Sequence, residues 1–219
     1  MQRLAMQASQ ILTSTDFTVA DRKFPVMVML EASLKNVVVR RATNVRFRRK
    51  FKPSTNEQKA GRGRPTTKGD VIRPLARVHK GKLITSSEAD RVETWEQILG
   101  VEQDAQALKM LARVWCDVEM VEQKTWSETQ KALNKTQSWT VCVVKHPNYD
   151  VPMIILFNVP LTGQQANRVM RGRWGVEQLP LVVKQLLGLH RMFVHESEMR
   201  FRLPELGFVA GLLLSDHAR

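Results

Sequence analysis

Cysteine, tyrosine and long apolar runs are scarce in this chain of 219 residues, and each scarcity excludes a class of protein. Two cysteines, Cys116 and Cys142, can form neither a disulfide framework nor a four-ligand zinc site alone, and they are typical of a reducing compartment. No run reaches the roughly 18 apolar residues of a membrane span, and the polar start lacks a signal-peptide core. With 43% hydrophobic and 25% charged residues, wholesale disorder is excluded too. We expect a soluble intracellular protein that buries a sizeable core.

Acidic residues are nearly absent from one segment. Between Arg40 and Lys82, fifteen Lys and Arg stand against Glu57 and Asp70, a net charge of +13 that equals the net charge of the whole chain. The remainder holds nineteen residues of each sign and is neutral. This concentration favours a polyanionic partner, because Lys and Arg release counterions from phosphates. A solvated basic loop is the alternative interpretation.

The apolar pattern at the start of the chain predicts the order strand, helix, strand. Residues 17–20 form a short apolar run, Pro25 opens a helical stretch to Leu34, and Val37–Val39 indicates a buried strand. This order is typical of an α/β layer. Further along, the patterns predict a strand at 71–72, a helix at 95–111, and strands at 112–121, 138–144 and 153–157, with a turn at 147–150. Near the end of the chain they predict a helix at 163–187, with a capping box at Thr162 and Gln165, and a buried helix at 204–214.

The helix expected at 163–187 carries a charged stripe. Arg173, Glu177 and Lys184 are separated by four and seven residues, so a helix of 3.6 residues per turn places them on one face, with Met170 one turn earlier. An ordinary ion pair between Arg173 and Glu177, worth about 0.3–0.5 kcal/mol, would explain the spacing equally well.

The pattern Arg-x(3)-Glu-x(6)-Lys resembles the C-terminal signature of insertion-sequence DDE transposases, in which a Tyr precedes the Arg; Met170 stands in its place. The resemblance extends over nearly the whole chain. It includes Asp21-Arg-Lys-Phe24, Gly61-Arg-Gly-Arg-Pro65 with Lys68-Gly69, Val159-Pro-Leu-Thr162, His190-Arg191 and Arg202-Leu-Pro-Glu-Leu206.

This resemblance implies an α/β fold with an incomplete RNase H-like core and a basic, β-rich insertion. The core would comprise residues 1–50 and the C-terminal helices of 159–219, with the insertion at 51–158. Asp21 matches the second catalytic acid of the family and Glu177 the third; Asp16 competes with Asp21 but lacks the following Arg-x-Phe. The two acids would hold Mg²⁺, which prefers carboxylate oxygens, in a two-metal site.

DNA at the transposon ends is the partner that the resemblance implies, with a homodimer as a further possibility and a bacterial, cytoplasmic, nucleoid-associated location. Gly61–Pro65 also matches an AT-hook core, and Phe47 and Phe51 interleave with cations, where core packing competes with base stacking. The cations expected to contact DNA are Arg173, Lys184, Arg62, Arg64, Lys68, Arg46, Arg48 and Arg49.

The first acid of the family precedes the second on a separate strand, and none of Met1–Ala20 matches it. We therefore expect a truncated transposase without cleavage activity. A non-catalytic basic nucleic-acid-binding protein is the alternative.

Overall fold

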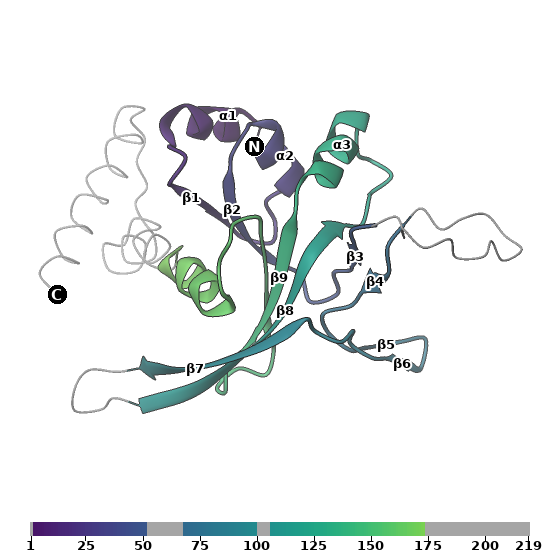
Figure 1. Cartoon of the computed structure of the whole chain (residues 1–219), viewed down its shortest axis with the longest axis vertical. Helices are drawn as coiled ribbons and strands as arrows, with labels where there is room; N and C mark the ends of the chain where they lie inside the picture. Colours follow the sequence, from purple (N-terminus) through teal and green to yellow (C-terminus); the bar gives the residue numbers. More distant parts are fainter. Residues whose placement is uncertain (1, 52–67, 100–105, 174–219) are drawn as a thin grey trace, which may run out of the picture. The chain divides into compact units, whose positions relative to one another are not determined.

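The computed structural model describes residues 2–51, 68–99 and 106–173. The chain divides into two compact units, Met1–Met170 and Arg171–Arg219, and the account below concerns the first. Its fold is mixed α/β, with a core that is mostly sheet and few helices (Figure 1). The elements are α1 Gln2–Ile11, β1 Phe17–Ala20, α2 Val26–Glu31, β2 Asn36–Arg41, β3 Phe47–Arg49, β4 Val71–Ile72, β5 Arg77–His79, β6 Lys82–Ile84, β7 Arg91–Leu99, β8 Gln106–Met120, α3 Glu128–Thr136, β9 Trp139–Lys145 and β10 Met153–Phe157.

One sheet of eight strands forms the core, in the order β1-β2-β10-β9-β8-β3-β4, with β7 added to β8. Strands β1 and β2 are parallel, and the other pairs are antiparallel. Strand β2, before residue 50, is hydrogen-bonded to β10, which lies in the segment 51–158. The two segments therefore share one sheet.

The predicted strand, helix and strand at the start of the chain are confirmed as β1, α2 and β2. Pro25 is the N-cap of α2, in extended backbone, where its missing N–H costs no helical hydrogen bond. Val37, Val38 and Val39 are fully buried, as expected of a strand covered on both faces. A helical crossover between two parallel strands is the usual way to join them.

Helices cover both faces of the sheet. On one face, which we call the α1–α3 face, Ala5 of α1 and Met29 of α2 pack with Val37, Trp139 and other core residues, and Leu133 of α3 packs against them. On the opposite face, a helix that begins at residue 163 and continues to the last described residue, 173, supplies Ala166 and Met170 to a second cluster. The sheet is thus the middle of a three-layer arrangement.

The helix predicted at 95–111 is wrong. Residues 91–99 and 106–114 form an antiparallel hairpin, in which Trp95 pairs with Met110. From residue 107 to residue 112 of β8, burial alternates: Leu108, Met110 and Ala112 are buried and the residues between them are exposed, which is the period of two of a strand. On β7 the alternation is masked because its inward positions include Glu93 and Gln97. The strand predicted at 112–121 is confirmed as the second half of β8.

The predicted hairpin at 138–157 is confirmed: β9 and β10 are antiparallel, with Ile155 opposite Cys142. Helices α1 and α3 were not predicted. Helix α3 begins with a capping box between Ser127 and Gln130. Its buried Asn134 accepts from the Met120 N–H at 3.1 Å and donates to the Met120 carbonyl at 2.8 Å, which fixes α3 to the end of β8.

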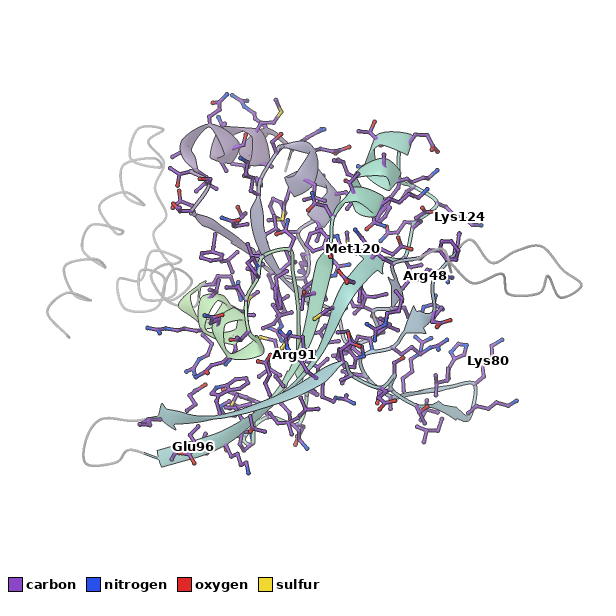
Figure 2. All side chains as sticks on the ribbon, in the orientation of Figure 1. Arg48, Lys80, Arg91, Glu96, Met120 and Lys124 are labelled. Atoms are coloured by element: carbon purple, nitrogen blue, oxygen red, sulfur yellow. The ribbon has the colours of Figure 1, made fainter. Side chains whose placement is uncertain are left out.

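Strands β5 and β6 form a separate two-stranded hairpin, which we call the β5–β6 arm (residues 77–84). Lys80 and Gly81 link its strands, with φ of 49° and 74°. Positive φ at both central residues is typical of a type I′ turn, which matches the twist of the two strands. Figure 2 shows Lys80 at the end of this arm.

Candidate metal and nucleic-acid site

Asp21 follows the last residue of β1, beside the parallel strand β2. Its carbonyl accepts from the Phe24 N–H at 2.9 Å, so the residue opens the turn that leads to Pro25 and α2. The Oδ1 atom of Asp21 is buried and has no hydrogen-bond partner among the described residues. A buried carboxylate oxygen without a partner costs free energy, which a bound cation would offset. The carboxyl ends of parallel strands are also where ligands bind in open α/β sheets.

The face of the sheet beside Asp21 is covered by the helix that begins at residue 163. Val19, two residues before Asp21, packs against the cluster that includes Ala166 and Met170. The predicted capping box at the start of this helix is confirmed: the Gln165 N–H donates to the Thr162 hydroxyl at 3.1 Å, and the Thr162 N–H donates to Gln165 Oε1 at 2.9 Å. The capping box thus fixes where the helix begins, and the packing of Ala166 and Met170 fixes its place on the sheet.

The Glu93 carboxylate of β7 binds the N-terminus of the same helix. Its Oε2 accepts from the Gly163 N–H at 2.6 Å, and its Oε1 accepts from Arg91 Nε at 2.7 Å. A carboxylate at a helix N-terminus is favourable because the first N–H groups carry a partial positive charge. Gly163 is buried there, and a Cβ atom at this position would lie 3.0 Å from Ala112 Cβ and from Cys142 Sγ. The hydrogen bond between Glu93 and Gly163 was not predicted, because it joins residues that are seventy positions apart in the sequence.

Met170, which stands where the signature has Tyr, is 4% exposed and belongs to the core. Met170 therefore packs in the core, and the Tyr hydroxyl of the signature would not lie on the surface at this position. Arg173 lies three residues further in the same helix and is the last described residue. Glu177 and Lys184 lie outside the described residues, so whether Asp21 and Glu177 converge stays a prediction. Within residues 2–51, 68–99 and 106–173, no three His, Cys, Asp or Glu side chains form a group able to hold a metal ion.

The predicted DNA-contacting cations fall into different environments. Arg62 and Arg64 lie outside the described residues, while Arg46 and Lys68 are exposed. Arg48 Nη1 donates to the Gly69 carbonyl at 3.1 Å, and Arg48 lies opposite Glu119 in the pairing of β3 with β8. Burial raises the pKa of Glu119, and the charge of Arg48 acts in the opposite direction. Arg48 is therefore occupied in part by its own sheet.

Arg49 is fully engaged within the fold. Its guanidinium donates to both carboxylate oxygens of Asp90 and, at 3.2 Å, to the Cys116 carbonyl. The Asp90 carboxylate accepts in turn from the Cys116 N–H at 2.8 Å. Hydrogen bonding to Arg49 lowers the pKa of Asp90, and the same pair raises the pKa of Arg49. This bidentate pairing joins β3 to the residue that precedes β7 and, through Cys116, to β8.

Phe47 is fully buried, which confirms core packing over base stacking for this residue, whereas Phe51 is 47% exposed. From the sequence, residues 40–82 were considered as one basic segment, and no cation of the β5–β6 arm was predicted to contact DNA. A signal was available: Lys80-Gly81 lies between two short runs with aliphatic residues, a pattern that indicates a hairpin.

Among the described residues, no helix is both long and apolar enough to cross a membrane. Comparison of the chain with protein-family models gives no match, and comparison with curated proteins gives none either. The resemblance to DDE transposases therefore depends on the motif residues alone.

Proposed function

We propose that this chain acts on DNA as part of a DDE-type transposase of an insertion-sequence element. Under this proposal, β1, α2 and β2 belong to an RNase H-like core, and the strands after residue 50 form its β-rich insertion. The observation that carries the proposal is the buried, unpartnered Oδ1 of Asp21 at the carboxyl end of β1. It supports a cation-binding role for the residue that the motif aligns with a catalytic acid.

Asp21 and Glu177 are the residues we assign to Mg²⁺. The fit on the Asp21 side is chemical: a carboxylate oxygen, buried and without a partner in the described residues, suits a hard cation. Bound there, the metal would stabilise charge on the oxygens of an in-line displacement at phosphorus. Arg173 and Lys184 would bind the phosphates of the same strand, the Arg with two parallel hydrogen bonds.

The first catalytic acid of the family, which would be the third carboxylate of the site beside Asp21 and Glu177, has no match in this chain. Loss of one member of a cooperative catalytic group typically lowers the rate by about 10³-fold or more. We therefore expect metal-dependent cleavage of plasmid DNA by the wild-type chain to equal that of Glu177→Ala. Cleavage well above this control would contradict the assignment of an incomplete site.

Metal binding tests the proposal directly, with Mn²⁺ as a paramagnetic probe followed by electron spin resonance. Asp21→Asn and Glu177→Gln should each weaken Mn²⁺ binding, since each removes a negative charge from the ligand set. Asp70→Asn is the matched control, because Asp70 is exposed and directly precedes β4, which lies at the opposite end of the strand order from β1. If Asp21→Asn binds Mn²⁺ as tightly as the wild type and Asp70→Asn, the catalytic-type role of Asp21 is wrong.

A non-catalytic nucleic-acid-binding protein remains the second candidate. It is favoured by the net charge of +13 between Arg40 and Lys82, which accounts for nucleic-acid binding without any catalytic acid. Under this alternative, charge reversal of Arg173 and Lys184 leaves DNA affinity unchanged, and only the cations between Arg40 and Lys82 contribute. Under the transposase proposal, both sets contribute. Titrations of DNA over a range of salt concentrations separate the two, because each phosphate contact adds to the salt slope.

A further inference from the structure

The β5–β6 arm has two chemically different faces. Val78 lies opposite Leu83, and these two side chains share one face because directly paired residues of an antiparallel hairpin point the same way. They are 70% and 69% exposed, so nothing in the described residues covers them. His79 and Lys82 form the next pair toward the turn, on the other face, and both are exposed.

The arm is strongly cationic. From residue 71 to residue 87 the chain has no carboxylate, and its cations there are Arg73, Arg77, Lys80 and Lys82. Among the described residues, no acidic side chain forms an ion pair with Lys80 or Lys82. The charge at the end of the arm is therefore free for an external anion. This differs from Arg49, whose charge is compensated within the sheet.

The base of the arm is held firmly although its end is exposed. The Ser87 N–H donates to the Arg73 carbonyl at 2.8 Å, and the Arg73 N–H donates to Ser87 Oγ at 2.9 Å. Arg113 of β8 binds both the segment that enters the arm and the segment that leaves it, since it donates to the Pro74 carbonyl at 2.8 Å and to Ser86 Oγ at 3.0 Å. These bonds join the arm to a central strand of the core.

A further bond fixes the segment that leaves the arm. Trp115, a fully buried residue of β8, donates from Nε1 to the Glu88 carbonyl at 2.6 Å. The Arg113 guanidinium lies 5.5 Å from the centre of the Trp115 ring, a cation–π contact that supports the same anchor. An exposed hairpin on a fixed base is suited to binding because little conformational entropy is lost when it meets a partner.

We infer that the β5–β6 arm enters the major groove of duplex DNA, with Val78 and Leu83 toward the base edges and Lys80 and Lys82 on the phosphates. The size of the arm favours this groove. Two strands lie about 4.7–4.9 Å apart before side chains are added, so a major groove about 12 Å wide admits such a ribbon without deformation, whereas a minor groove about 6 Å wide would have to be widened. Exposed aliphatic side chains suit the thymine C5-methyl group, which only the major groove presents.

Duplex RNA is the polyanion that this geometry disfavours. The major groove of A-form RNA is deep and too narrow for protein side chains to read. An acidic protein surface would use the cations but would leave Val78 and Leu83 without a matched partner. The inference rests on the proposed function, because it names where the same chain meets DNA, and it is tested separately from the metal site.

The first test compares two double variants of equal charge change by fluorescence anisotropy on a DNA duplex over a range of salt concentrations. Lys80→Gln/Lys82→Gln should reduce the slope of log affinity against log salt by about 1.8, since each phosphate contact contributes about 0.9. At 0.1 M salt the affinity should fall roughly tenfold or more. The control, Lys35→Gln/Lys124→Gln, removes two exposed lysines outside the arm and should leave the slope unchanged. Equal behaviour of the two variants overturns the inference.

The second test addresses the groove. Val78→Ser/Leu83→Ser should bind a thymine-containing duplex more weakly by about fourfold per lost methyl contact. On a duplex with deoxyuridine in place of thymine, the wild type should fall to the level of this variant. Both substitutions change exposed side chains, so circular dichroism and the melting temperature should match the wild type. Displacement of the wild type by netropsin, a minor-groove ligand, or an equal effect of the variant on duplex RNA would overturn the assignment of the groove.

The two proposals fail in distinguishable ways. If the wild type binds DNA with a steep salt slope while the arm variants match their control, the arm inference is wrong and the proposed function stands. If Asp21→Asn retains Mn²⁺ binding while Lys80→Gln/Lys82→Gln loses DNA affinity, the metal assignment is wrong and the arm inference stands. If the wild type does not bind DNA, both are wrong.

Discussion

Replacement of Gly163 by alanine should destabilise the protein, although alanine is the better helix former. Gly163 is the first residue of the helix that covers the face beside Asp21. An added Cβ would lie 2.9 Å from Glu93 Oε2 and 3.0 Å from both Ala112 Cβ and Cys142 Sγ. The Glu93 carboxylate can rotate away, but Ala112 Cβ is fixed to the backbone of a fully buried strand position. The helix end must therefore move off the sheet.

The magnitude follows from two opposing effects. Forcing an extra methyl group into a packed core costs about 1–3 kcal/mol. Exchange of glycine for alanine within a helix gains about 0.5–1 kcal/mol. The gain is smaller at the first turn, where the backbone is only partly helical, so the steric cost wins. We expect a net loss of about 1–2 kcal/mol in the free energy of unfolding, with a melting temperature lower by about 2–4 °C per kcal/mol.

The same helix supplies a matched control. At Gly172 an added Cβ would have no described atom within 4 Å beyond the neighbouring residues and the helix's own backbone. Gly172→Ala should therefore stabilise the protein by about 0.5–1 kcal/mol. Urea unfolding followed by the fluorescence of the buried Trp115 and Trp139 measures both variants. Opposite signs are the expected result; a Gly163→Ala variant as stable as the wild type would refute the close packing of this helix on the sheet.

Three further predictions concern the β3 region and the thiols. Gly69→Ala should destabilise the protein by about 3 kcal/mol or more, because a Cβ there would lie 2.1 Å from the Arg49 carbonyl oxygen; urea unfolding measures this, and an unchanged midpoint would contradict it. Arg49 lowers the pKa of Asp90, so the stabilisation from this pair is present above the unfolded pKa of about 4 and is lost as the pH falls through the folded pKa. Asp90→Asn should therefore be less stable than the wild type at pH 7, and the difference should narrow at pH 3; a constant difference would contradict the pairing. Burial raises the pKa of Cys142 to about 12, so iodoacetamide at pH 8 should label the half-buried Cys116 and spare Cys142 in the folded chain, as peptide mass spectrometry would show; equal labelling would contradict this.

Elements specified by local interactions were predicted from the sequence. The capping box at Thr162 and Gln165 involves residues three apart, and the turn between β9 and β10 is marked by residues 147–150. Val37–Val39 is apolar without interruption because both faces of β2 are covered, and such a run indicates a buried strand wherever it occurs. In these cases the residues that fix the structure are close together along the chain.

Elements that depend on distant partners were missed. Strand β7 carries Glu93 at an inward position, which breaks the apolar alternation that would have identified it. That carboxylate is satisfied by Arg91 nearby and by the N–H of Gly163, which no pattern within β7 could indicate. The close approach at Gly69 is similar, since its cause is the Arg49 carbonyl of another strand. Sequence periodicity describes one element at a time, and these contacts join two.

The charge of the basic segment illustrates what the fold adds to a count of residues. Arg48 and Arg49 contribute as much to the net charge as Lys80 and Lys82, and the sequence predicts DNA contacts only for the first pair. The fold places Glu119 of β8 opposite Arg48 and Asp90, the residue before β7, in an ion pair with Arg49. It leaves the second pair at the end of an arm without a carboxylate nearby in the described residues. Because a phosphate binds best to charge that no internal partner compensates, the arm and not β3 is where the described part of this segment should meet DNA.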